Sequence, residues 1–179
     1  MVRTMKPTTQ QTGSTLAVDH ERIYRAHKAR VLNLCRLLLR DPDEAEDVAQ
    51  EVFLRAFQRI GSHETPKVWE AWLVRVAVNA CRDRQRSAWW KSRRRPGDLD
   101  ELAPWLSLSS EEHARSKEWQ SRVWQALHAL NNRQRNVFVL RYIEGWSTND
   151  VAESLGLTAA AVKTHLFRAV RHLRKVVER

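Results

Sequence analysis

Apolar residues recur at spacings of three and four along two stretches of the chain, and this period constrains the fold more than any other feature. Val31, Leu34 and Leu38 show it in the first stretch, and Val162 and Leu166 show it in the second. This period is typical of amphipathic helices, and no alternation of useful length indicates a strand. We therefore predict an all-α fold.

The two stretches are separated by residues 89–117, which contain prolines, a serine cluster and an acidic run. Such a composition is typical of a linker. The sequence predicts a disordered tail over residues 1–17, a helical domain over 18–88, a flexible linker over 89–117 and a second helical domain over 118–179. The length of 179 residues fits two small domains.

The net charge of +10 is distributed unevenly. Basic residues outnumber acidic ones in residues 18–97 and again in 119–179, whereas acidic residues dominate 98–118. Two basic blocks of this kind indicate two units that bind a polyanion. A pair of solvated basic surfaces is the alternative that charge alone leaves open.

Several classes of protein are excluded or disfavoured by what the sequence lacks. No apolar run reaches the length of a membrane span, and the N-terminus has no apolar segment of a secretory signal. Cys35 and Cys81 lack the spacing of a disulfide framework or a zinc site, which favours a reducing cytoplasm. We find no catalytic constellation and expect no enzyme activity, no metal and no cofactor.

The predicted third helix, over residues 66–86, has two distinct faces. Its core face is formed by Trp69, Leu73, Val76 and Ala80. A second face, which we call the arginine stripe, carries Arg75, Asn79, Arg82 and Arg86, with Trp72 at its edge. Arginines neutralise phosphates, an amide can bond a base edge, and an indole can stack on an unpaired base. The stripe thus fits a nucleic-acid strand, although a solvated basic face is also consistent with it.

The predicted second helix follows an Asp41-Pro42-Asp43 turn and has an acidic face with one leucine. This acidic face consists of Asp47, Gln50, Glu51 and Leu54. It would repel phosphate and suits a basic partner helix. The alternative is a solvated surface with one stray apolar residue.

Near the C-terminus the sequence predicts a helix-turn-helix. Ser147 and Asp150 form a capping box, Gly156 ends a short helix, and Thr158 caps a longer one. One face of the longer helix is apolar, and the other, which we call the recognition face, suits the major groove. Its members are Lys163, Thr164, His165, Phe167, Arg168 and Arg171. A plain amphipathic hairpin is the other possibility.

Three segments together resemble the extracytoplasmic-function (ECF) group of bacterial sigma factors. AEDVAQEVFLRA at residues 45–56 is similar to the polymerase-binding signature, and WLVRVAVNACRD at 72–83 is similar to the promoter-melting segment. QRNVFVLRYIEGWS at 134–147, followed by DVA and LGL, resembles the C-terminal domain of the group. The likeness covers residues 18–88 and 118–177.

The resemblance implies a role for each face. The acidic face would bind the clamp helices of the largest subunit of core RNA polymerase, and the flap region would be a further contact. Trp72 and the arginine stripe would open the −10 element of promoter DNA. The recognition face would read the −35 element, with Arg133 and Arg135 on the upstream backbone. An anti-sigma factor is a possible further partner.

The sequence departs from the family pattern at two places on the recognition helix. Ala160-Ala161 stands where the family usually has Gly-Thr, and His165 stands where Arg is common.

Two other functions remain open at this point: a stand-alone helix-turn-helix regulator, and a structural or RNA-binding helical protein. The two promoter elements lie about 70 Å apart, and a 29-residue linker reaches about 100 Å when extended.

Overall fold

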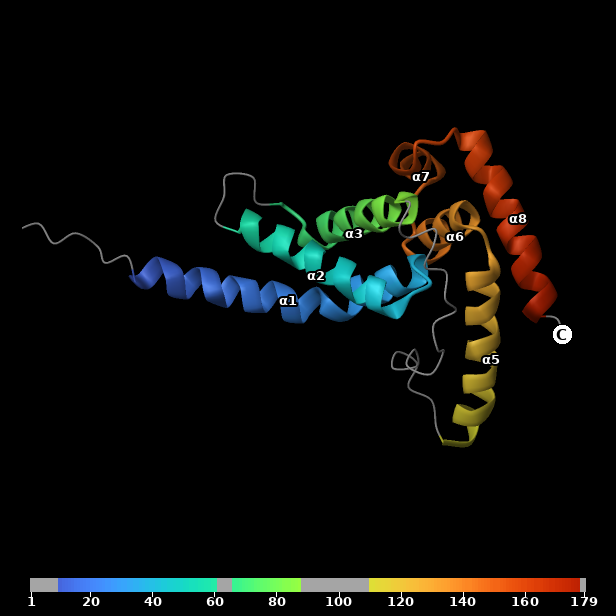
Figure 1. The fold of residues 1–179 in the computed structure, drawn as a ribbon, viewed down its shortest axis with the longest axis horizontal. Helices are drawn as coiled ribbons and strands as arrows, with labels where there is room; N and C mark the ends of the chain where they lie inside the picture. The colour runs from blue at the N-terminus through green and yellow to red at the C-terminus, as the bar shows by residue number, and fades with distance from the viewer. Residues whose placement is uncertain (1–9, 61–65, 88–109, 178–179) are drawn as a thin grey trace, which may run out of the picture.

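The computed structural model describes residues 10–60, 66–87 and 110–177, and every regular element within these ranges is helical. This confirms the predicted fold class. In chain order the elements are α1 (Gln10–Leu38), α2 (Pro42–Arg59), α3 (Trp69–Arg86), α5 (Ser110–Ala129), α6 (Asn132–Phe138), the π-helical turn η1 (Val139–Ile143), α7 (Thr148–Leu155) and α8 (Ala159–Val177) (Figure 1).

The helices α1, α2 and α3 form an antiparallel bundle. Their buried side chains are mainly aliphatic, as the period of three and four predicts: Leu34 and Leu38 of α1, Val48 and Val52 of α2, and Leu73 of α3 are all fully buried. Burial of such side chains supplies most of the stability of a small helical domain.

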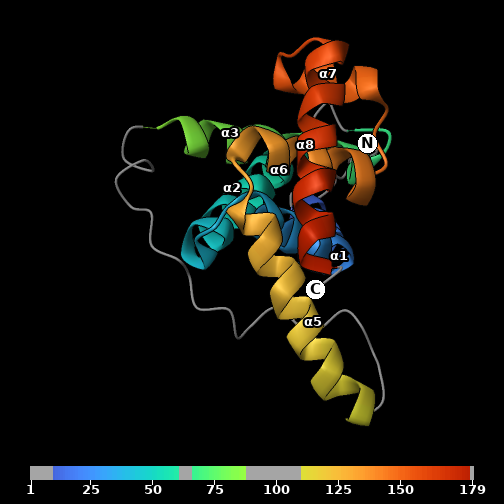
Figure 2. The ribbon, with the colours of Figure 1, turned by 90° about the vertical axis from the view of Figure 1, so that its right-hand side faces the viewer.

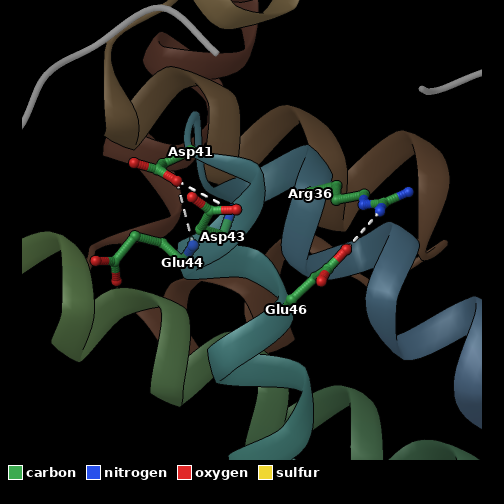
Figure 3. A network of polar contacts seen from close by, with 5 residues as sticks. All are labelled: Arg36, Asp41, Asp43, Glu44 and Glu46. Carbon is green, nitrogen blue, oxygen red and sulfur yellow. Dashed lines mark hydrogen bonds and ion pairs between the residues drawn. The ribbon is translucent and has the colours of Figure 1, made fainter. Parts of the chain in front are cut away.

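The turn between α1 and α2 forms where the Asp41-Pro42-Asp43 motif predicts it (Figure 3). The Asp41 carboxylate accepts hydrogen bonds from the backbone N–H groups of Asp43 (3.0 Å) and Glu44 (3.3 Å), so it caps α2. Pro42 occupies the first turn of α2, where its missing N–H costs nothing. An ion pair of 2.9 Å between Arg36 and Glu46 ties the two helices together.

The second group of helices packs around α8, with α5, α6 and α7 against it (Figures 1 and 2). Its buried apolar residues include Val137, Leu140, Val151, Val162 and Ala169. The two groups of helices are in direct contact. The C-terminal group lies across the C-terminal ends of α1 and α3, and it contacts both (Figure 1).

Three predicted boundaries differ from the structure. Helix α1 begins at Gln10, inside the segment predicted to be a disordered tail, because extending an existing helix costs far less than starting one. Helix α5 begins at Ser110, inside the predicted linker. Helix α3 begins at Trp69, since Val68 has an extended backbone with φ of −131°.

The remaining parts of the predicted tail and linker, residues 1–9 and 88–109, lie outside the described residues, as do residues 61–65 of the loop before α3. Among the helices that the structure describes, none combines the length and apolar character needed to cross a bilayer.

Candidate functional site

The acidic face lies on the side of α2 that points away from the bundle core. Asp47, Gln50 and Leu54 are exposed, and Leu54 keeps 61% of its surface accessible. Glu51 is half-buried and forms an ion pair with Arg55, one turn further along the helix. The capping and core contacts of α2 leave this face without a role in the fold, so its leucine is available to a partner.

An open hollow of about 360 Å³ borders the acidic face. It lies between α2 and α3, and its lining includes Glu51, Arg55, Asp83, Arg84 and Ser87. Arg84 also reaches the buried carboxylate of Glu44 at 2.6 Å, which fixes the wall of the hollow that α3 contributes. The lining carries charges of both signs beside apolar surface, so it can receive the stem and the polar end of a long side chain from a docked helix.

The arginine stripe is only partly open to solvent. Arg75, Asn79 and Arg86 are exposed, whereas Arg82 is half-buried and donates to the backbone carbonyl of Ser154 in α7. Burial lowers the pKa of Arg82, and the nearby charges of Arg86 and Arg133 lower it further. Three of the four side chains of the stripe are therefore open to solvent, and the fourth is held by the C-terminal domain.

Trp72 is half-buried at the edge of the stripe. Its ring packs edge-on against Trp69, with centroids 5.7 Å apart, and the guanidinium of Arg59 lies 5.5 Å from its centroid. These two contacts hold the indole in place. The predicted core face is shifted: Leu73 and Ala80 are buried as expected, Trp69 and Val76 are only half-buried, and the buried set extends to other residues, namely Val74, Ala77, Val78, Cys81 and Gln85.

The helix-turn-helix forms as the sequence predicts. Ser147 Oγ accepts from the Asp150 N–H at 3.1 Å, and the Ser147 N–H donates to the Asp150 carboxylate at 3.2 Å. The Ser147 hydroxyl also donates to the Asp150 carboxylate at 2.6 Å, and this hydrogen bond, together with the one from the Ser147 N–H, lowers the pKa of Asp150. Gly156 ends α7 at a φ of +61°, in the left-handed region, and Thr158 Oγ1 accepts from the Ala161 N–H at 3.1 Å to cap α8.

The recognition face of α8 is open to solvent. Lys163, Thr164, Phe167, Arg168 and Arg171 are all exposed, and Phe167 keeps 68% of its surface accessible. His165 is half-buried, and burial together with Arg133 and Arg168 lowers its pKa. The imidazole is therefore uncharged at neutral pH, so it offers one donor and one acceptor where a guanidinium would offer only donors.

Arg133 and Arg135, which the resemblance assigns to the upstream DNA backbone, have opposite environments. Arg133 is exposed, whereas Arg135 is fully buried. Burial and the neighbouring Arg40 lower the pKa of Arg135 to about 9, so its guanidinium is still charged at neutral pH. In this conformation Arg135 cannot reach DNA.

The sequence did not reveal the polar contacts between the two domains. Gln85 and Asn136, both buried, form a reciprocal pair of hydrogen bonds of 2.9 and 3.3 Å. Arg30 is paired across the two domains with Glu144 at 2.9 Å and, within its own domain, with Glu70 at 3.0 Å. One signal was available for Gln85: it lies eight residues beyond Ala77 and four beyond Cys81, at a core position of the helical period, where a polar residue needs a buried partner.

The fold and these surfaces define a helical DNA-binding protein with a helix-turn-helix at its C-terminal end and a second, arginine-lined helix in its N-terminal bundle. No group of three or more potential metal ligands occurs among the described residues. Comparisons with known proteins agree with this class. Residues 23–91 match the family model for Sigma-70 region 2, and residues 120–173 match the model for Sigma-70, region 4.

Relatives align over most of the chain. The RNA polymerase sigma-E factor of Streptomyces avermitilis is 31% identical over 163 residues, which cover 90% of this chain and 86% of that protein. The ECF RNA polymerase sigma factor SigL of Mycobacterium tuberculosis is 35% identical over 160 residues, which cover 87% of each chain. The chain belongs to the extracytoplasmic-function group of the RNA polymerase sigma factors.

The fold is also found in a solved structure. The sigma factor RpoE of Bartonella quintana, crystallised in complex with the anti-sigma factor NepR, superimposes with a TM-score of 0.65 at 21% identity. The superposition covers 89% of this chain and 97% of that chain. The arrangement of helices is therefore shared with a sigma factor, although the sequences have diverged.

Proposed function

We propose that the three surfaces divide the work of promoter recognition among them. The acidic face binds core RNA polymerase, the arginine stripe opens the −10 element, and the recognition face reads the −35 element. The observation that carries this proposal is the exposure of the recognition face on a fully capped helix-turn-helix. On this account residues 18–88 act as sigma region 2 and residues 118–179 as sigma region 4, in keeping with the two family-model matches.

Polymerase binding rests on charge and shape complementarity. The exposed Leu54 is surrounded by Asp47, Gln50 and Glu51, and the hollow beside it can receive one side chain of the partner. Basic clamp helices of the largest subunit fit this surface, since they bring the opposite charge together with an apolar ridge. The flap region of the polymerase would hold the C-terminal domain.

Strand opening at the −10 element is driven by the binding of unpaired bases and phosphates to the protein. Arg75 and Arg86 neutralise backbone phosphates, Asn79 bonds a base edge, and Trp72 stacks on an unpaired base. Unstacking costs a few kcal/mol per step, which contacts to the extruded bases offset. Arg82 joins these contacts once it is released from Ser154.

Recognition of the −35 element uses the major groove. Lys163, Arg168 and Arg171 approach phosphates and base edges, and the exposed Phe167 can meet a thymine methyl group. Arg133 lies on α6, near both Arg82 and His165, and supports the DNA backbone from the side.

The protein itself needs no catalytic group, since the polymerase carries out the chemistry in the cytoplasm. The sigma factor in the matched Bartonella quintana structure is bound to an anti-sigma factor. We propose that an anti-sigma factor likewise controls this chain, by covering one of the three surfaces.

The experiment separates polymerase binding from promoter opening. Glu51→Lys reverses charge on the acidic face and should abolish co-elution with core polymerase, whereas Asn79→Ala should bind core normally and lose open complexes in a permanganate footprint. Gln58→Lys provides a matched control, because Gln58 is exposed on α2 outside the acidic face. Retained co-elution of Glu51→Lys, or full opening by Asn79→Ala, would contradict the proposal. Tight specific DNA binding by the free protein would instead favour a stand-alone regulator.

A further inference from the structure

A row of basic side chains crosses the junction of the two domains. Arg86 lies at the end of α3, Arg133 on α6 and Arg168 on α8, and all three are exposed. Helix α6 lies between the end of α3 and α8 (Figure 1). We propose that these three arginines, which we call the basic strip, bind the backbone of one single-stranded nucleic acid across both domains.

Two further side chains connect the members of the basic strip. Burial lowers the pKa of Arg82, one turn before Arg86, and the charges of Arg86 and Arg133 lower it further. Burial also lowers the pKa of His165 on α8, and Arg133 and Arg168 add to this effect. Arg133 therefore lies within electrostatic range of groups on both α3 and α8, so the positive charge continues from one domain to the other.

The protein does not neutralise the basic strip with its own carboxylates. Among the described residues, no ion pair involves a member of the strip, whereas six other arginines each pair with a carboxylate: Arg22, Arg25, Arg30, Arg36, Arg55 and Arg84. Asp83 offsets part of the repulsion at Arg82. A chain of phosphates laid along the strip would relieve the remaining repulsion, which favours binding of a polyanion.

The path of the basic strip and its aromatic neighbour favour a single strand over a duplex. The strip runs over three helices from two domains, and a flexible backbone can follow this path, whereas a duplex is stiff over such a length. Phe167, next to Arg168, keeps 68% of its surface accessible, so an unpaired base can stack on its ring. Basic side chains in a row beside an exposed ring are typical of proteins that bind single strands without reading their sequence.

A strand bound to the basic strip would oppose promoter binding. The strip exists only while the two domains are in contact, as in the bond from Arg82 to the Ser154 carbonyl. Promoter elements two helical turns apart would hold Arg86 and Arg168 about 70 Å from one another. The bound strand and promoter DNA therefore favour different arrangements, and each weakens binding of the other. This consequence rests on the proposed function, whereas the site itself does not.

Fluorescence anisotropy of labelled strands tests the basic strip on the full chain. The probes are oligouridine and oligodeoxyuridine of about 12 nucleotides, which share their bases and differ in the 2′-hydroxyl. We expect one strand per chain and a logarithmic salt slope of about 2, because three exposed arginines each contribute about 0.7. Tighter binding of oligouridine would assign the site to RNA, and tighter binding of oligodeoxyuridine would assign it to a separated DNA strand. Failure of both strands to bind would overturn the proposal.

Substitutions on three different helices show whether the strip is one site. Arg86→Ala, Arg133→Ala and Arg168→Ala should each lower the salt slope by about 0.7 and weaken binding about fivefold at about 0.1 M salt. Arg25→Ala is the control, because Arg25 is exposed on α1 and already paired with Glu21. It should leave the affinity and the slope unchanged.

The outcomes separate the basic strip from the proposed function. Two strands per chain, or an effect of Arg86→Ala without one of Arg133→Ala and Arg168→Ala, would overturn the strip, since each domain would then bind independently. If the variants behave as expected but the protein does not co-elute with core polymerase, the strip stands and the proposed function fails. If the protein does co-elute, a saturating strand should lower the yield of run-off transcripts, and an unchanged yield would overturn the competition.

Discussion

Helices α3 and α8 each carry a basic face that the sequence assigns to DNA, yet the structure presents the two faces differently. On α8 five of the six predicted side chains are exposed, whereas on α3 Arg82 is directed into the other domain. The same contrast recurs within α6, where Arg133 is exposed and Arg135 is buried. Helical period thus identifies the residues that share a face, but not whether another domain covers that face.

The largest expected effect on stability comes from replacing the buried arginine of the pair on α6. Arg135→Ala removes three hydrogen bonds and leaves the Leu38 and Leu130 carbonyls with one side-chain donor each, from Gln85 and Arg40. We expect the free energy of unfolding to fall by about 3 kcal/mol in urea titrations. Arg133→Ala is the control and should change it by less than about 0.5 kcal/mol. Equal effects of the two substitutions would show that Arg135 is not a structural residue.

Measuring stability against pH extends the contrast between buried and exposed basic side chains to His128. Burial, Arg135 and Arg40 lower the pKa of His128 to about 3, and its ring stacks on Trp124 at 4.2 Å between centroids. An unfolded histidine titrates near 6.5, so between pH 6.5 and 3 the unfolded chain holds the extra proton and stability falls as pH falls. The slope from this group approaches about 1.4 kcal/mol per pH unit.

His128→Phe keeps an aromatic ring against Trp124 and cannot take up the proton. The difference in unfolding free energy between the native protein and His128→Phe, measured at pH 7 and pH 5, isolates this group from the carboxylates. A difference that is the same at both pH values would contradict the burial of His128.

The capping box of Ser147 and Asp150 should make a modest, local contribution to stability. Ser147→Ala removes the acceptor for the Asp150 N–H, and helix caps contribute about 1 kcal/mol. We expect a corresponding loss in thermal or urea unfolding. Ser147→Thr retains a hydroxyl and should recover most of it. If both variants are as stable as the native protein, the cap does not position α7.

The smallest effect distinguishes the free and the covered arginines of α3. Binding of single-stranded DNA weakens with salt, and each phosphate contact contributes about 0.7 to the logarithmic slope. In the free protein Arg86→Ala should reduce the slope by about this amount, whereas Arg82→Ala should change it less, because Arg82 is bonded to Ser154. Equal changes in slope would mean that the arginine stripe is uniformly accessible.

Local chemistry made much of the structure predictable. The Asp41 cap, the Ser147–Asp150 box and the left-handed Gly156 each act within a few residues, so their signatures are readable in the sequence. The exposed acidic and recognition faces follow from the helical period for the same reason. The polar contacts between the two domains were not predictable, because they join residues 51 to 114 positions apart, and period alone does not say which polar side chains will meet.

Run-off transcription tests the central claim most directly. Sigma-free bacterial core polymerase is supplied with fragments of the source genome, with and without this protein. The account predicts discrete new transcripts, lost in Asn79→Ala and in Glu51→Lys, whose start sites lie downstream of paired −10 and −35 elements. Absence of both new transcripts and co-elution with core polymerase would contradict it.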